Sequence, residues 1–391
     1  MAINKKLSYR DNPKLKRVGV QMNYTEEQVL EYRKCAQDPI YFAKYINIVS
    51  LDHGIIPFDM YDFQKDMIKT FNDNRFVIVK CPRQVGKTTT AVAFLLWSVL
   101  FKDSQNIAIL ANKGKTANDI LAKLQLAYEN LPMWLQQGVV VWNKGNVELE
   151  NGSKIVAAST SSSAIRGGSF NCVFLDEFAF VPNNIAEEFF NSVYPVISSG
   201  KTSKIIIVST PNGMNLFYKL WTDAINKKNN YKTFEIHWSM VPGRDEAWKE
   251  ETIRNTSERQ FRQEFETEFL GSSNTLVSGH KLQQIAYRDP VATQDMLKIY
   301  EMPKKQEEGD KSDHLYCICV DVSEGKNLDS SAFQVIDIST TPYRQVATYA
   351  SSSITPILFP TVIYNTARMY NDAYVLVEIN NNPQVADSLH Q

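Results

Sequence analysis

The sequence contains few cysteines, almost no net charge and no long apolar segment. Its five cysteines are odd in number and scattered along 391 residues, which excludes a disulfide framework and is typical of a reduced, cytosolic protein. No apolar run approaches the length of a membrane span, and the N-terminus lacks the apolar core of a signal peptide. The formal net charge of −1 excludes a strongly basic nucleic-acid binder, so any nucleic-acid surface must be a local patch. We therefore expect a soluble protein that is not secreted.

The chain is long enough for two or three domains that each bury a core. We place an N-terminal arm with helices at residues 1–57, a first domain at 58–277 and a second at 278–391. The first 20 residues carry six basic side chains and little apolar periodicity. That pattern favours a mobile, solvated tail, and an arm that contacts phosphates is the alternative.

A short apolar strand leads into Cys-Pro-Arg-Gln-Val-Gly-Lys-Thr at residues 81–88, and a long apolar helix pattern follows. This order is typical of a phosphate-binding loop, in which backbone N–H groups and a helix N-terminus bind phosphates. In that interpretation Lys87 reaches the terminal phosphates and the Thr88 hydroxyl binds Mg²⁺. Cys81 stands where the usual pattern has glycine. A chance Gly-Lys-Thr at a helix start is the alternative, but the flanking strand and helix favour a nucleotide site.

Strand and helix patterns alternate after this loop. Asn151-Gly152, flanked by alternating residues, predicts a β-hairpin. Apolar runs at 171–175 and 204–208 predict buried strands, and each ends in polar residues. This spacing predicts an α/β domain with a mainly parallel sheet and with functional residues at the carboxyl ends of its strands.

Two of these polar ends carry groups suited to ATP hydrolysis. Asp176 is expected to order Mg²⁺ beside Thr88, and Glu177 to polarise the attacking water. Ser209-Thr210, before a proline, fits a sensor of the γ-phosphate, although a capped turn would have the same sequence.

Two arginines and one glutamine have open roles. Arg83 lies inside the loop and could stabilise transition-state charge in cis, whereas Arg166 could reach a neighbouring subunit as an arginine finger. Either could instead form a surface ion pair. Gln64 could read adenine, or be an ordinary surface residue. The residues that we expect around the nucleotide are Gln64, Cys81, Pro82, Arg83, Gln84, Val85, Gly86, Lys87, Thr88, Thr89, Ser209 and Thr210.

Five segments together resemble the large terminase subunit of tailed bacteriophages, the motor that packages DNA into the procapsid. They are residues 81–88, 164–168, 173–182, 207–213 and 261–265. The resemblance extends from about Phe58 to the end of the chain. It implies an ATPase that translocates double-stranded DNA as a homo-oligomeric ring, a pentamer, docked on the portal protein with a small terminase subunit. It also implies that the protein acts in the host cytoplasm and transiently at the procapsid portal, that it contacts no membrane and that it is not part of the mature virion.

The resemblance assigns the same roles to the residues of the first domain. It makes Lys87 and Thr88 ligands of ATP and Mg²⁺, Asp176 and Glu177 the acidic pair with Glu177 catalytic, and Ser209 and Thr210 part of the coupling motif. It leaves the finger open between Arg83 and Arg166.

The second domain shows acids on two predicted strands. Asp321 ends the first of three consecutive strands (315–320, 332–338 and 343–350), and Glu378 lies on a later one. Carboxylates on adjacent strands suit a two-metal nuclease with Mg²⁺ or Mn²⁺. The resemblance implies an RNase H-like nuclease domain in which Asp321 and Glu378 are the first two metal-binding catalytic acids.

In the nuclease domain of that family, the third metal-binding acid lies on a later segment, well beyond the second acid. We therefore expect an incomplete nuclease domain that is inactive in this chain. A helicase-like DNA-remodelling ATPase is the alternative function, since it would share the phosphate loop and the acidic pair.

Overall fold

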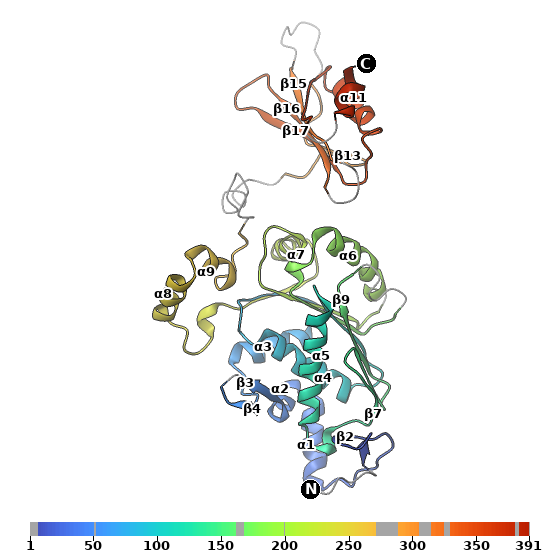
Figure 1. The fold of residues 1–391 in the computed structure, drawn as a ribbon, viewed down its shortest axis with the longest axis vertical. Helices are drawn as coiled ribbons and strands as arrows, with labels where there is room; N and C mark the ends of the chain where they lie inside the picture. The colour runs from blue at the N-terminus through green and yellow to red at the C-terminus, as the bar shows by residue number, and fades with distance from the viewer. Residues whose placement is uncertain are drawn as a thin grey trace. The chain divides into compact units, whose positions relative to one another are not determined.

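The structure is a computed structural model, and it describes residues 7–50, 52–161, 168–198, 200–270, 288–304, 314–323, 329–379 and 383–390. The chain forms two compact units, unit 1 (Met1–Gln283) and unit 2 (Gln284–Gln391), each described here by itself (Figure 1). The boundary predicted between residues 277 and 278 lies outside the described residues. Within the described ranges, none of the helices is both long enough and apolar enough to be a membrane span.

The described part of unit 1 is built on an eight-stranded sheet in the order β12-β5-β11-β10-β6-β9-β8-β7. Pairing is parallel from β12 to β9 and antiparallel at β8 and β7. The strands are β5 (Phe76–Lys80), β6 (Asn106–Ala111), β7 (Val139–Trp142), β8 (Asn146–Leu149), β9 (Lys154–Ser159), β10 (Cys172–Asp176), β11 (Lys204–Ser209) and β12 (Lys232–Glu235). The predicted α/β class with a mainly parallel sheet is confirmed, and so is the hairpin at Asn151-Gly152, which joins β8 to β9.

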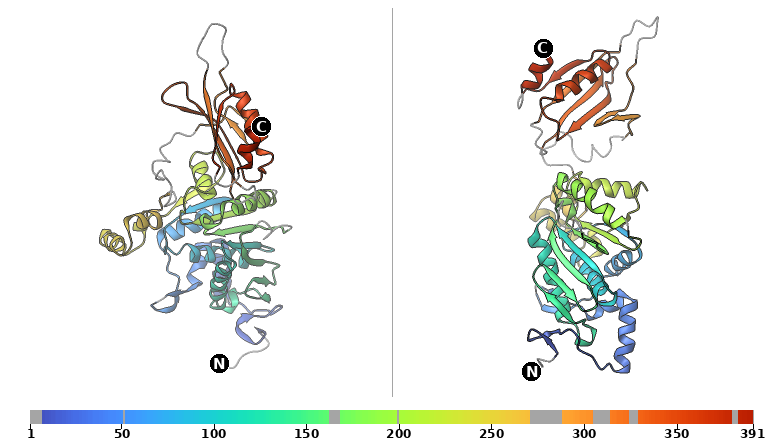
Figure 2. Two further views of the ribbon diagram at one scale, coloured as in Figure 1. Left: turned by 45° about the horizontal axis from the view of Figure 1, so that its top comes forward. Right: turned by 90° about the vertical axis from the view of Figure 1, so that its right-hand side faces the viewer.

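Helices cover both faces of this sheet because alternate residues of its central strands are apolar on both sides. One core joins residues such as Val77 and Ile107 to the helices α3, α4 and α5, and the other joins Ile78 and Ala108 to α6 and α7 (Figure 2). The helix α4 is buried almost all round, so it lies at the centre of the first layer. These helices are α3 (Asp62–Asp73), α4 (Lys87–Phe101), α5 (Gly114–Glu129), α6 (Asn183–Ser198) and α7 (Leu216–Ile225).

Smaller elements complete unit 1. A capping box begins the first helix, in which Thr25 and Gln28 bond each other's backbone N–H groups. The remaining described elements are α1 (Glu26–Gln37), α2 (Pro39–Phe42), α8 (Glu246–Asn255), α9 (Glu258–Glu264), the hairpin β3 (Asn47–Ser50) and β4 (Gly54–Pro57), and the 3₁₀ turns Ala43–Tyr45, Met133–Leu135, Phe178–Phe180 and Trp238–Met240.

The N-terminal segment is fixed to the edge of the sheet. It forms the hairpin β1 (Ser8–Tyr9) and β2 (Asn12–Lys16), which lies beside β7 (Figure 1). Lys16 is 6% exposed; its backbone N–H donates to Gln136 Oε1 at 3.0 Å and its Nζ to Gln136 O at 3.2 Å. The interpretation of this segment as a mobile tail is wrong for residues 8–17, because its partners lie more than a hundred residues away, where no local pattern reveals them.

Unit 2 contains a mixed six-stranded sheet in its described residues, in the order β13-β14-β17-β16-β15-β18. The helix α11 packs on the core face of this sheet, and β15 is antiparallel to β16 but parallel to β18. The three predicted consecutive strands are confirmed as β15, β16 and β17, whereas the hairpin β13–β14 was not predicted. The elements are β13 (Ala292–Gln294), β14 (Leu297–Ile299), β15 (Tyr316–Asp321), β16 (Ser331–Asp337), β17 (Arg344–Ser351), β18 (Tyr374–Val377), α11 (Phe359–Met369) and α12 (Gln384–His390).

Candidate nucleotide site

Three neighbouring parallel strands bring the polar clusters of unit 1 together. The strands β5, β11 and β10 are adjacent, with Ser209 opposite Lys80 and Asp176 opposite Val208. Because all three run in the same direction, the loop 81–86, the pair Ser209-Thr210 and the pair Asp176-Glu177 follow them at one edge of the sheet.

The loop 81–86 ends in a left-handed backbone conformation that favours glycine. Gly86 has φ +73°, and it caps the N-terminus of α4. A Cβ at this position would lie 2.5 Å from Nε2 of Gln64. That side chain is buried and donates from Nε2 to Val85 O at 3.1 Å, while its Oε1 accepts from Tyr61 N at 3.0 Å. Gln64 therefore joins the loop to the N-terminus of α3, with one end of its amide bonded to each.

Lys87 forms an ion pair with Glu177. Its Nζ donates to Glu177 Oε1 at 2.5 Å and to Thr210 Oγ1 at 3.3 Å. Burial lowers the pKa of Lys87, but the surrounding acidic groups of Cys81, Glu177 and Asp176 outweigh burial and raise that pKa above its ordinary value. Lys87 is therefore a cation held against the carboxylate that sequence analysis assigns to catalysis.

Glu177 stands in an uncommon backbone conformation, with φ 50° and ψ 42°. Non-glycine residues in the left-handed region cost about 1 kcal/mol or more and tend to occur at functional sites. Thr210 N donates to Glu177 Oε2 at 3.4 Å, and Ser209 Oγ lies at the same distance from that oxygen. Ala179 N donates to Ser209 Oγ at 3.1 Å. The last residue of β11 and the residue that follows it therefore contact the Glu177 carboxylate directly, as the predicted sensor would require.

Thr88 and Asp176 meet beside this ion pair. Thr88 Oγ1 donates to Asp176 Oδ2 at 3.3 Å, and the buried Oδ1 of Asp176 has no hydrogen-bond partner among the described residues. Burial raises the pKa of Asp176 to about 6, and the attraction of Lys87 opposes only part of that effect. A hydroxyl and a carboxylate are ligands that Mg²⁺ prefers. These two residues therefore fit a Mg²⁺ ion.

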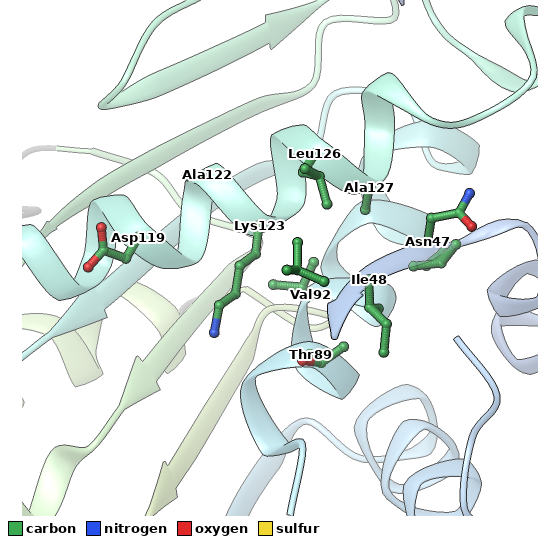
Figure 3. Close-up of a pocket in the computed structure, with 11 residues that line it drawn as sticks. Asn47, Ile48, Thr89, Val92, Asp119, Ala122, Lys123, Leu126 and Ala127 are labelled. Carbon is green, nitrogen blue, oxygen red and sulfur yellow. The ribbon is translucent and has the colours of Figure 1, made fainter. Parts of the chain in front are cut away.

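Thr89 and Cys81 lie differently from the other loop residues. Thr89 lines a cavity of about 310 Å³ between α4, α5 and the strand β3, together with Val92, Ile48 and Lys123 (Figure 3). Cys81 is fully buried, its N–H donates to Ser209 O at 3.2 Å, and burial raises the pKa of its thiol to about 12. Cys81 is thus a packing residue that joins the loop to β11.

Of the two candidate arginines, Arg83 lies within the described residues and Arg166 does not. Arg83 is half-exposed; its backbone N–H donates to Glu264 O at 3.0 Å, and its guanidinium forms an ion pair with the Glu264 carboxylate. Arg166 lies outside the described residues. The structure therefore attaches Arg83 to the end of α9, within a segment that sequence analysis had noted only as a motif.

Sequence reasoning missed Arg244. Its guanidinium donates to Arg83 O at 3.3 Å and to Gln84 O at 3.0 Å, and lies 4.8 Å from the ring centre of Trp248. Burial lowers the pKa of Arg244. Its sequence context, a Pro-Gly turn, gives no sign of a contact with the loop 160 residues earlier.

Unit 2 places its two predicted acids side by side. Asp321 ends β15 and Glu378 follows β18; Glu378 N donates to Val320 O at 2.9 Å, and both acids line a cavity of about 540 Å³. Within the described ranges, no cluster of three or more His, Cys, Asp or Glu side chains could hold a metal ion. Of the two other acids near Asp321, Glu324 lies outside the described residues, and the backbone oxygen of Asp329 accepts from Ser323 Oγ.

Comparison with known proteins adds to this geometry. The family model of the terminase large subunit, T4likevirus-type, N-terminal, matches residues 78–284, more than half of the 391-residue chain. The curated terminase large subunit of Thermus phage G20c is 29% identical over 191 residues, which cover 45% of this chain and 36% of that protein. The tripartite terminase subunit 3 of human herpesvirus 8 is 22% identical over 161 residues, covering 40% of this chain and 22% of that protein.

Solved large terminases resemble most of the chain, among them that of bacteriophage HK97. The large terminase of bacteriophage HK97 superposes with a TM-score of 0.52 at 15% identity, covering 88% of this chain and 74% of that one. A likeness at this identity supports the fold. The segment of this chain that matches the terminase large subunit of Thermus phage G20c spans 36% of that protein, little more than a third of its length.

Proposed function

This chain belongs to the terminase large subunit family, as its motifs predicted, and from that premise we propose that it is an ATP-hydrolysing motor that moves double-stranded viral DNA into a procapsid. The observation that carries the ATPase proposal is the meeting of Lys87, Thr88, Asp176 and Glu177 at the ends of neighbouring parallel strands. Phosphoryl transfer needs positioned charge more than covalent chemistry, and these four side chains supply it.

The roles follow from the contacts. Lys87 leaves Glu177 to bind the β- and γ-phosphates of ATP, because a phosphate carries more negative charge than a single carboxylate. Glu177, once released, holds and polarises the attacking water. Thr88 and Asp176 would hold Mg²⁺, which neutralises charge on the phosphate oxygens. Thr210 contacts both Lys87 and Glu177, so it senses whether Lys87 is bound to Glu177 or to the phosphates.

The proposal extends to partners that family membership supports. The motor works as a homo-oligomeric ring, a pentamer, on the portal protein with a small terminase subunit, in the host cytoplasm and away from the mature virion. Unit 2 is a nuclease domain in which Asp321 and Glu378 bind Mg²⁺ or Mn²⁺. With a net charge of −1, DNA contacts must come from local patches.

Turnover and binding, measured separately, test the ATPase proposal. Glu177→Gln should lower phosphate release by about 10²–10⁴-fold, the usual contribution of a general base, while Mg·ATP affinity changes little. Lys87→Ala should abolish both. The exposed Glu187→Gln on α6 is the matched control and should behave as wild type. Equal loss of binding and turnover in Glu177→Gln would contradict the assignment of Glu177.

A further inference from the structure

A second polar cavity lies at the opposite edge of the unit 1 sheet. It has a volume of about 420 Å³, and the cationic residues that line it are Arg75, Lys102, Lys201 and Lys204. Arg75 directly precedes β5, Lys204 begins β11, and Lys102 follows the last residue of α4. Because the strands are parallel, their beginnings lie at the edge away from the nucleotide loop. None of the described residues that line this cavity is acidic.

Two of the four cations are bound to the protein itself. Lys204 Nζ donates to three carbonyl oxygens at the end of α3, those of Phe71, Asn72 and Asn74, at 2.7–2.9 Å. Arg75 donates from Nε to Ser203 O at 3.2 Å. These two residues therefore supply charge and rigid walls, and Lys204 has no N–H left to donate.

The other two cations are available to a ligand. Lys102 Nζ lies 4.5 Å from the ring centre of Trp97, and no ion pair or hydrogen bond among the described residues engages the ammonium of Lys102 or of Lys201. Asn171 also lines the cavity, and its Oδ1 accepts from Asn106 N at 2.8 Å, which leaves its amide N–H groups as further donors.

The cavity carries an excess of positive charge. The helices α3 and α4 end at this cavity, and the partial negative charge of each helix C-terminus offsets roughly half of one positive charge. If the negative charge of the nearby, exposed Asp73 is also subtracted, the cavity still carries a net charge of more than +1. Burial lowers the pKa of Lys204, and the neighbouring Lys102 and Arg75 lower it further, while burial lowers the pKa of Lys102. Lys102 and Arg75 thus oppose the charge of Lys204, against the opposite effects of Cys172 and Asp73, and an anion in the cavity would favour the charged form of these cations.

We propose that this cavity binds a small phosphate-bearing anion, inorganic phosphate or a phosphomonoester, through Lys102, Lys201 and the Asn171 amide. Lys102 and Lys204 are half-buried, and the whole cavity is smaller than a nucleic-acid duplex, so a compact anion fits it better than a polymer backbone. The site is independent of the proposed ATPase function.

Calorimetric titration of phosphate into the 391-residue Lys87→Ala protein tests the proposal, because that change disables the nucleotide loop. Phosphate should still bind, and Lys102→Gln with Lys201→Gln in the same background should weaken binding at least tenfold, through the loss of two charged donors. The matched control, Lys115→Gln with Lys219→Gln, changes the net charge equally at exposed positions and should leave binding unchanged. Lys201→Gln alone, at an exposed residue, should weaken binding severalfold without affecting folding.

Three results would overturn the proposal. Phosphate binding that survives the double change would show that these lysines do not hold the anion. Binding that disappears in Lys87→Ala protein itself would place it at the nucleotide loop. Binding of a short phosphodiester duplex through Lys102 and Lys201, without binding of inorganic phosphate, would make the surface a nucleic-acid contact.

Discussion

Gly86→Ala is the change whose cost the structure defines most closely. Gly86 has φ +73°, and a Cβ there would lie 2.5 Å from Nε2 of Gln64, a distance that Cβ atoms essentially never show. The left-handed conformation costs an alanine about 1–2 kcal/mol. Gln64 must also move and weaken its bond to Val85 O, which contributes about 1 kcal/mol.

These two effects together predict a loss of roughly 2–3 kcal/mol. In a domain of this size each kcal/mol lowers the melting temperature by about 2–4 °C, so the transition of unit 1 should fall by roughly 5–10 °C. Nucleotide affinity should fall as well, because Gly86 joins the loop to the first turn of α4. Thermal denaturation and equilibrium binding of Mg·ATP measure the two effects.

Gly54 provides the matched control. It has φ +71°, but no atom lies within 4 Å of the position that a Cβ would take there, so Gly54→Ala should cost only the conformational part, about 1–2 kcal/mol. In a Gln64→Ala background, Gly86→Ala should likewise cost only that part, since the contact is gone. A Gly86→Ala variant no less stable than Gly54→Ala, or an unchanged cost in the Gln64→Ala background, would refute the role of the contact with Gln64.

Three further predictions concern the rest of the chain. If Arg166 acts in trans, mixing Arg166→Ala with wild-type subunits should reduce ATPase activity more than in proportion to the mutant fraction; proportional loss would make it a cis or structural residue. The chain alone should show little Mg²⁺- or Mn²⁺-dependent DNA cleavage, because the described residues of unit 2 offer no three-ligand cluster; strong cleavage abolished by Asp321→Ala would contradict this. Burial of Asp337 raises its pKa, but hydrogen bonds from Ser339 and Arg344 outweigh burial and hold that pKa at about 2. Because the pKa is lower in the folded state, this stabilisation is complete above about pH 4 and is lost as the pH falls towards 2; Asp337→Asn should lower thermal stability at pH 6 and flatten its acid dependence.

The meeting of Lys87, Thr88, Asp176 and Glu177 in unit 1 was predictable because it depends on local order. Gly86-Lys87 between a strand and a helix, and Asp176-Glu177 after a strand, are signals contained within a few residues. Parallel strands then bring such ends to one edge, which the sequence also predicts. Successive residues of an α-helix point about 100° apart, which is why Thr88 contacts Asp176 whereas Thr89 lines the cavity between α4 and α5.

Contacts between distant segments were not predictable in this way. Nothing near Arg244 indicates that its guanidinium would reach the carbonyl of Gln84. The ion pair of Lys87 with Glu177 joins two residues that sequence analysis had assigned to different partners, the phosphates and the water. Such pairings depend on the spacing of the folded strands, which composition and periodicity do not contain.

The distant contacts of the N-terminal hairpin β1–β2 determine when it can fold during synthesis of the chain. Lys16 bonds to Gln136, 120 residues further on, and Gly19 N donates to Glu150, 131 residues further on. At ribosomal rates of about 5–20 residues per second, these partners are synthesised on the order of ten seconds later. Until then Leu15, which is 2% exposed in the finished fold, has no core to enter. The hairpin β1–β2 is therefore translated before the residues that it packs against, and it can take its final place only after them.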